Sequence, residues 1–249
     1  MNTLRYLYRY LRNSILRAIA LIFGRKLEKL DDILIISPHP DDEILGCGGL
    51  ISYMVKHHKT ISIIFMTKGE NVNKNISPEV LKVERTKLAK EALSSVGQSL
   101  DSIYFLNFRD SEINIKDAET EKLNALINRI NPQVVLVPHQ LEGWNDHVQS
   151  NYIIRKLIQN RPIKLYEYCV WFWYTMPFPK VFTIKWHDAR YFKMGKDTHK
   201  LKKEAIKIYM DETNAEGLPY SGALPPVLLT SCSWREEIFF ESKPDFVEM

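Results

Sequence analysis

The sequence predicts an α/β protein with a Rossmann-like, doubly wound and mainly parallel sheet that carries helices on both faces. Four short apolar runs, typical of buried strands, alternate with segments of helical periodicity. Each run is followed by a polar cluster, and ligands of open α/β sheets bind beyond the carboxyl ends of the strands. A chain of 249 residues with 45% hydrophobic content can bury a sizeable core. We therefore expect an N-terminal arm over residues 1–30 and one domain over 31–249.

The predicted elements follow in chain order, and right-handed crossovers would bring the ends of the first strands together. The first four predicted strands are 33–37, 61–67, 103–108 and 133–138. The predicted helices between and after them lie near 43–57, 79–96, 117–130 and 147–159. The second half is less regular, and we expect strands within 165–178 and 181–186, a helix at about 197–212 and a loop-rich tail. Internal repeats and low-complexity linkers are absent from the sequence.

The N-terminal arm is strongly basic. Seven Lys or Arg residues and one Glu lie among the first 30 residues, whereas the whole chain carries only +4. The basic charge thus belongs to the arm, and we expect no nucleic-acid partner. A stripe of apolar residues recurs in the arm at helical spacing: Leu4, Leu7, Leu11, Ile15, Ala18 and Ile22.

This stripe leaves two alternatives for the arm. Residues 1–23 can form an amphipathic helix that lies on an anionic membrane, or the helix packs on the domain or remains a basic tail. The longest uncharged run, 18–24, is far shorter than the roughly 20 residues that span a bilayer. Arg17 also interrupts the apolar stretch, and this argues against a secretory signal. Three separated cysteines, Cys47, Cys169 and Cys232, favour a reducing compartment, so we expect a cytoplasmic protein.

The stretch PHPDDEILGCGG, residues 38–49, concentrates candidate metal ligands at the end of the first strand. His39 and Asp42 can face one ion across a strand-to-helix turn, and imidazole and carboxylate suit zinc. His147, at the start of the helix after the fourth strand, is the expected third ligand. A simpler interpretation of the stretch is helix capping by Asp41 or Asp42. The second Asp-His pair at a neighbouring strand favours a metal site.

Asp41 is the expected general base. A metal lowers the pKa of its water and polarises a carbonyl, while a neighbouring carboxylate can accept the water proton. These are the parts of an amide hydrolase.

Over about residues 33–160 the sequence resembles the PIG-L/LmbE-like zinc-dependent N-acetylglucosaminyl deacetylases. PHPDDEILGCGG matches the family's opening signature, and the further similar segments are MTKGE (66–70), ERTKLAKEALSSVG (84–97), FLNFRD (105–110) and DH (146–147). Two later segments, 200–212 and 234–240, match weakly. The resemblance implies deacetylation of an N-acetylated amino sugar, with Zn²⁺ as cofactor and Fe²⁺ as an alternative. It also implies that His39, Asp42 and His147 bind the metal, that Asp41 is the base and that Asp146 orients a neighbour.

The chain departs from the family pattern at three positions. Trp144 stands where the family often has a histidine that stabilises the intermediate, and Asn145 replaces a proline. His139 is a candidate substitute for that histidine, although it is also interpretable as a loop histidine. Leu88 replaces a glutamate that follows the helix arginine, Arg85, which is alternatively a surface cation.

Further residues are expected to contact the substrate: Glu70, Arg85, Asp110 and Trp144. Turn and cap roles are the alternative for Glu70, Asn71 and Asp110. The aromatic run at 170–178 can supply a platform for a sugar or lipid, or a buried strand.

Two other functions remain open. A nucleotide-binding module is disfavoured because the GxGxxG fingerprint is missing. A catalytically degenerate member that serves as a sugar-binding or scaffold protein is the stronger alternative.

Overall fold

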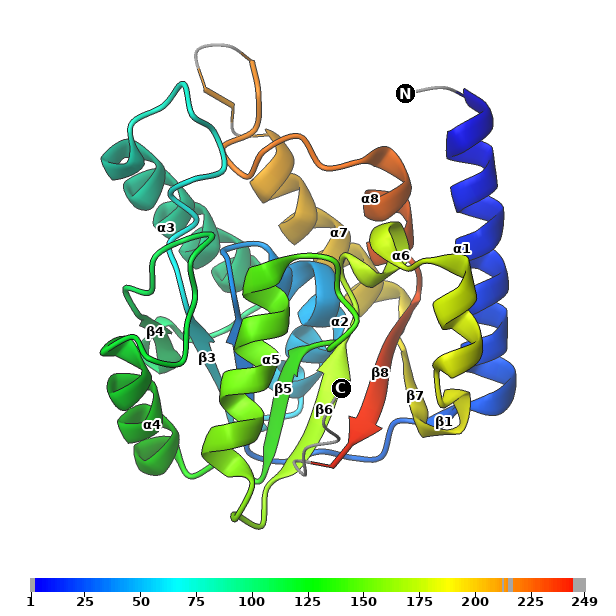
Figure 1. Cartoon of the computed structure of the whole chain (residues 1–249), viewed down its shortest axis with the longest axis horizontal. Helices are drawn as coiled ribbons and strands as arrows, with labels where there is room; N and C mark the ends of the chain where they lie inside the picture. Colours follow the sequence, from blue (N-terminus) through cyan, green and yellow to red (C-terminus); the bar gives the residue numbers. More distant parts are fainter. Residues whose placement is uncertain (1–2, 212, 215–216, 244–249) are drawn as a thin grey trace.

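The computed structural model describes residues 3–211, 213–214 and 217–243, and within them a mixed sheet is flanked by helices on both faces (Figure 1). The strands are β1 Arg25–Lys26, β2 Ile33–Ser37, β3 Ile61–Phe65, β4 Ile103–Phe105, β5 Val134–Pro138, β6 Lys164–Tyr168, β7 Ala189–Lys193 and β8 Glu236–Ser242. They form one eight-stranded sheet in the order β1-β7-β8-β6-β5-β2-β3-β4. Only β8 runs antiparallel to its neighbours. The predicted fold class is confirmed.

The helices form two layers. They are α1 Thr3–Phe23, α2 Asp42–Lys56, α3 Pro78–Ser95, α4 Glu119–Ile130, α5 Asn145–Ile158, α6 Phe172–Thr175, α7 Lys196–Asp211 and α8 Pro226–Cys232, with 3-10 turns η1 Leu100–Ser102, η2 Phe178–Thr183 and η3 Trp186–Asp188. Helices α4 and α5 share one apolar core, and α1, α2, α3, α7 and α8 share the other.

The central strands are buried because both of their faces are apolar. In β2, Ile33 and Ile35 enter one core while Leu34 and Ile36 enter the other. Burying such a side chain stabilises the fold by about 1.5–3 kcal/mol. The register aligns Ile35 with Ile63 on one side and with Leu136 on the other. A continuous apolar run therefore fixes β2 at the centre of the sheet.

The strand order reverses at β2, and this reversal positions the functional site. The chain passes from β2 to β3 on one side, whereas β5 lies on the other side of β2. Helix α2 follows β2 and α5 follows β5. The starts of these two helices are consequently adjacent, at the type of switch point where α/β sheets bind ligands.

Helix α2 lies close to the sheet. A Cβ at Gly46 would collide with the ring of Tyr168, so only glycine permits this approach. The Tyr168 hydroxyl in turn donates a hydrogen bond to the carbonyl oxygen of Ile36, at 2.8 Å. These contacts fix the beginning of α2 over the end of β2.

For the second half, one expectation is confirmed only in part and two are wrong. The segment predicted as a strand over 165–178 leaves the sheet after Tyr168 and continues as α6, and 181–186 forms 3-10 turns instead of a strand. After Tyr168 the backbone N–H groups of Val170 and Trp171 donate to the Glu142 carboxylate, so they do not pair with a neighbouring strand. The predicted loop-rich tail contains α8 and the central strand β8. Strand β8 was missed in the sequence because its apolar segment, Ile238–Phe240, is only three residues long and has charged residues on both sides.

The N-terminal arm packs on the domain. Leu16 and Ala20 of α1 belong to the main core, and β1 adds to the edge of the sheet beside β7. In the part of the chain that the structure describes, every helix is too short or too polar to cross a membrane.

Candidate metal centre and active site

The turn between β2 and α2 holds Asp41 in an unusual backbone conformation. Asp41 precedes the first residue of α2 and has a φ of 123°, which a side chain other than glycine rarely adopts. The Glu43 carboxylate accepts the Asp41 N–H at 3.0 Å, and the Asp41 carbonyl accepts the N–H groups of Ile44 and Leu45. Such strain persists where surrounding contacts impose it, and it is frequent at functional sites.

Three predicted ligands converge at this turn. His39 Nδ1 lies 3.3 Å from Asp42 Oδ2, and His147 Nε2 lies 3.3 Å from the same oxygen. The ligand atoms of His39, Asp42 and His147 are close enough together to hold one ion. Both ring nitrogens of the buried His147 lack a hydrogen-bond partner. Because a buried ring nitrogen without a hydrogen bond is costly, and the Asp42 carboxylate faces both histidines, this donor set fits a divalent cation such as zinc.

A second potential ligand group consists of His39, Asp110 and Asp146. His39 Nε2 lies 3.1 Å from Asp146 Oδ2 and 3.3 Å from Asp110 Oδ1. These carboxylates already have partners, since Asp146 accepts the N–H of Ser111 at 2.7 Å and Asp110 accepts that of Asn71 at 2.8 Å. Asp110 and Asp146 therefore contact Nε2 of His39 and orient its ring, so that Nδ1 faces Asp42.

Glu142 supports the other histidine. Its Oε2 lies 3.5 Å from His147 Nδ1, and the same carboxylate accepts the N–H groups of Val170 and Trp171. The backbone contacts hold Glu142 in place, and Glu142 faces the nitrogen of His147 that points away from Asp42. The sequence analysis did not identify this residue, although an acidic residue five positions before a ligand histidine was a usable signal.

Asp41 is held beside the ligands without belonging to them. Arg85 Nη2 donates to Asp41 Oδ2 at 3.1 Å and to the Pro40 carbonyl, and Arg85 Nη1 donates to the Gly69 carbonyl at 3.1 Å. Arg85 is buried, so it is not a surface cation. Leu88, one helical turn later, lies in the apolar core. The partner of Arg85 is thus Asp41.

Electrostatics at this corner favour a bound cation. Burial raises the pKa of Asp41 to about 7, while the nearby Arg85 opposes that rise. Burial alone would lower the pKa of His147, but Asp42 and Glu142 raise it to about 9. Burial alone would raise the pKa of Asp42, yet the two histidines hold this pKa below its usual range. A divalent ion can supply the positive charge that the protons on these histidines otherwise provide.

The three candidate ligands and Asp41 open into a cavity of about 510 Å³. The cavity also exposes polar groups from other strand ends, and it has an aromatic and apolar side. Its lining residues outside the ligand group include Asn71, Arg85, Asp110, Ser111, Trp144, Asn145, Asp146, Trp171 and the loop 221–224. The volume suits a small ligand.

Trp144 and Trp171 form the aromatic side of the cavity. Their ring centroids are 5.2 Å apart in an edge-to-face arrangement, and Trp144 is 52% exposed. Trp171 and the 221–224 loop were not singled out as individual residues from the sequence. The sequence around 221–224 has no helical or strand periodicity, so local pattern gave no signal for this loop.

Two of the predicted site residues do not line the cavity. His139 is buried against Phe172 and Phe240, with both ring centroids 4.9 Å from its own, and burial lowers the pKa of its imidazole. Its Nδ1 accepts the N–H of Leu141 at 3.0 Å. Glu70 lies behind Asp110, whose N–H it faces at 3.4 Å. These positions favour supporting roles for His139 and Glu70 over contact with a ligand.

The sequence of the site matches a known family. A model of the family described as PIG-L, GlcNAc-PI de-N-acetylase, matches residues 34–158, just over half of the chain. The chain belongs to the PIG-L family. The matched range runs from β2 to the end of α5, so it contains the three candidate ligands, Asp41 and Asp146.

Similarity to individual PIG-L family relatives is distant. A Bacillus cereus protein named probable N-acetyl-alpha-D-glucosaminyl L-malate deacetylase 2 is 25% identical over 138 residues. The match covers 52% of this chain and 62% of that relative, so it spans less than two thirds of the relative's length.

Solved structures share the fold. N,N'-diacetylchitobiose deacetylase from Pyrococcus horikoshii, in complex with an inhibitor, matches with a TM-score of 0.62 at 19% identity, covering 85% of this chain and 84% of that one. GalB, a 4-carboxy-2-hydroxymuconate hydratase from Pseudomonas putida KT2440, also has a TM-score of 0.62, at 15% identity, covering 87% and 98%. Because two different activities are named on one fold, the fold alone does not select the reaction.

Proposed function

We propose that this PIG-L family chain is a zinc-dependent deacetylase that hydrolyses the N-acetyl group of an amino sugar in a GlcNAc-type glycoconjugate, glycolipid or polysaccharide precursor. The observation that carries the proposal is the convergence of His39, Asp42 and His147 on one point of the cavity, with Asp41 beside them. Three protein ligands and an adjacent carboxylate are the requirements of a hydrolytic metal site.

His39, Asp42 and His147 would hold the metal. The mixed imidazole and carboxylate donors suit zinc, with Fe²⁺ as the alternative. When bound, the ion would lower the pKa of a water molecule and polarise the acetyl carbonyl. Asp146 and Glu142, which face the outer nitrogens of the two histidines, would keep the rings oriented.

Asp41 would transfer the proton. Its carboxylate accepts a proton from the water as the water oxygen bonds to the acetyl carbon. The same carboxyl then delivers the proton to the amine nitrogen as the C–N bond breaks, which yields acetate and the free amino sugar. Arg85 would keep Asp41 in the geometry for both transfers, because it anchors the carboxylate and the Pro40 carbonyl together.

Trp144 would bind the substrate. An exposed indole on the cavity wall offers a flat apolar face to a sugar ring, and its edge-to-face contact with Trp171 holds it in place. The aromatic run therefore contributes at least one side chain to the site, although Phe172 and Trp173 of the same run are buried in the core.

Trp144→Ala is expected to lower kcat/KM by about tenfold, mainly through a higher KM, because the lost stacking serves substrate binding. Trp144→Phe should recover most of this loss. Phe182→Ala is a matched control, since Phe182 is 79% exposed and does not line the cavity. Steady-state kinetics of acetate release would measure all three variants. Wild-type KM in Trp144→Ala would exclude Trp144 from the binding site.

A sugar-binding or scaffold role remains the second candidate, because Trp144 replaces the family's usual histidine at the cavity. The deciding experiment is a screen of the zinc-loaded protein for acetate release from free, nucleotide-linked and lipid-linked N-acetyl amino sugars, with bound metal quantified in the same samples. We expect at least one class to release acetate. Binding of a sugar with full metal occupancy and no acetate release would favour the scaffold role.

The expected cytoplasmic location is part of the same proposal. All three cysteines are buried as free thiols, which is compatible with a reducing compartment.

A further inference from the structure

Helix α1 is held on the domain by one face only. Asn13 Nδ2 donates to Ser231 Oγ at 2.9 Å, and Leu16 and Ala20 are buried in the core. Arg12 Nη1 donates to the Met176 carbonyl at 2.9 Å. These contacts fix the rotation of the helix about its axis, so its opposite face has a defined outward direction.

The outward face is the apolar stripe that the sequence periodicity identified. Its large side chains are each at least half exposed, and they are Leu4, Leu7, Tyr8, Leu11, Ile15 and Ile22. At a rise of about 1.5 Å per residue the stripe is roughly 27 Å long. A continuous exposed apolar surface of this size marks an interaction site, unlike isolated exposed apolar residues such as Phe182.

The charges around the stripe indicate what it contacts. Helix α1 contains four arginines and neither Asp nor Glu. Arg17 pairs with Glu236 of the domain, whereas Arg5 at one end of the stripe and Arg25 and Lys26 just beyond its other end are exposed. A second copy packed antiparallel on the stripe would place Arg5 of one helix near Arg25 and Lys26 of the other, so like charges would meet. The headgroups of an anionic bilayer supply the missing negative charge.

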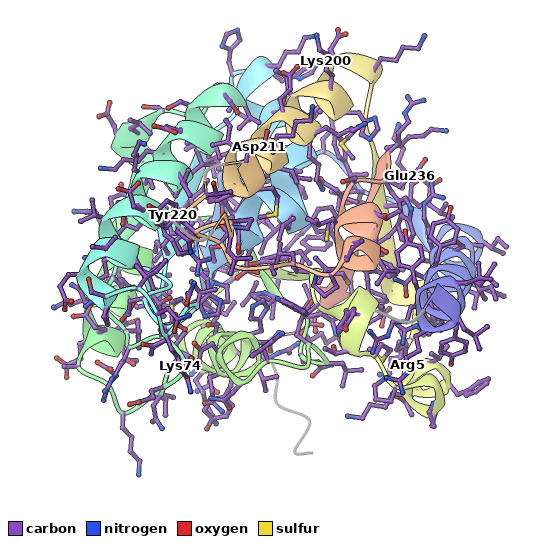
Figure 2. The ribbon with its side chains drawn as sticks, turned by 90° about the horizontal axis from the view of Figure 1, so that it is seen from above. Arg5, Lys74, Lys200, Asp211, Tyr220 and Glu236 are labelled. Atoms are coloured by element: carbon purple, nitrogen blue, oxygen red, sulfur yellow. The ribbon has the colours of Figure 1, made fainter. Side chains whose placement is uncertain are left out.

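A series of ring contacts joins the N-terminal half of α1 to the cavity. Arg9 lies over the ring of Tyr174 at 3.9 Å, Tyr174 is 5.9 Å from Trp171, and Trp171 is 5.2 Å from Trp144. Both tryptophans line the cavity. Figure 2, a view from above, shows α1 at one edge of the molecule, where Arg5 is labelled. The domain-facing side of α1 is thus connected to the cavity wall.

We propose that the outward stripe of α1 is a docking surface for an anionic lipid bilayer. The helix lies parallel to the bilayer plane, with its apolar side chains at the boundary between headgroups and acyl chains and its exposed cations among the headgroups. The inward face stays on the domain, so docking requires no rearrangement of the core. This inference is independent of the catalytic activity.

The test compares point variants of the full chain, because removing α1 would take the buried Leu16 and Ala20 out of the core. Leu11→Gln/Ile15→Gln changes two outward side chains, and Val80→Gln/Val83→Gln is the matched control on an exposed face of α3. Sedimentation with phosphatidylglycerol–phosphatidylcholine vesicles and with pure phosphatidylcholine vesicles would be measured at low and high salt.

We expect the wild type and the α3 variant to bind the anionic vesicles at low salt, and to bind them less at high salt. The stripe variant should bind roughly tenfold more weakly, with unchanged circular dichroism and Tm. Equal binding by the wild type and the stripe variant would overturn the proposal, as would negligible binding by the wild type. A stripe-dependent dimer in sedimentation velocity, without vesicle binding, would instead assign this face to a second copy.

Discussion

Replacing His147 with alanine is expected to abolish stable metal binding and, with it, acetate release. His147 is almost completely buried, and its Nε2 faces the same Asp42 oxygen that His39 faces. Its loss leaves two candidate ligands where a catalytic zinc site uses three. The fall in affinity should exceed the roughly 10–100-fold typical of losing an outer hydrogen-bond partner.

Elemental analysis after dialysis, together with acetate release, would measure this effect. His187→Ala is the matched control, because His187 is an exposed histidine far from the cavity lining and its removal should change neither quantity. Full metal occupancy in His147→Ala would show that other residues hold the ion. The alternative ligand group is His39, Asp110 and Asp146.

The ligand group could be predicted because its placement depends on regular features. The apolar runs that became β2 and β5 are unambiguous, and a doubly wound sheet places the ends of such strands together. The strand order then brings the side chains of His39 and His147 close enough to Asp42 to share one ion. It also brings His39 into contact with Asp146, which is 107 positions later in the sequence.

The supporting contacts could not be predicted in the same way. Arg85 lies on a helix whose other cations are exposed or half-buried, and its burial against Asp41 depends on how α3 docks beside the β2–α2 turn. The stripe on α1 shows the same limit, because periodicity reveals an apolar face without showing what covers it. The structure turns Leu16 and Ala20 inward and the predicted stripe outward.

His139 shows where residue type alone is insufficient. A histidine directly after β5 was a reasonable candidate for stabilising the intermediate, but its ring packs against Phe172 and Phe240 instead of lining the cavity. The side chain at a strand end points to one face or the other, and a shift of one position reverses that choice. Because His139 is turned away from the cavity, the candidate stabilising groups are the polar lining of the cavity and the metal ion that we propose.

Asp41→Asn is expected to retain metal while lowering turnover by about 10²–10⁴, the usual contribution of a general base. The substituted amide would have nearly the same shape as the carboxylate but could not accept a proton. The three candidate ligands would be untouched, so occupancy should stay near that of the wild type. The lost ion pair with Arg85 requires a Tm measurement, which separates slower chemistry from partial unfolding.

The pH profile supplies a second readout for Asp41. The carboxyl group acts as a base only when ionised, so wild-type kcat/KM should fall as pH decreases through its pKa. Burial raises this pKa to about 7, and a cation held beside Asp41 would lower it, so the acidic limb should lie at or below about pH 7. Asp41→Asn should lose this limb. Unchanged turnover at full metal occupancy, or an unchanged acidic limb, would transfer the role of base to another carboxylate of the cavity.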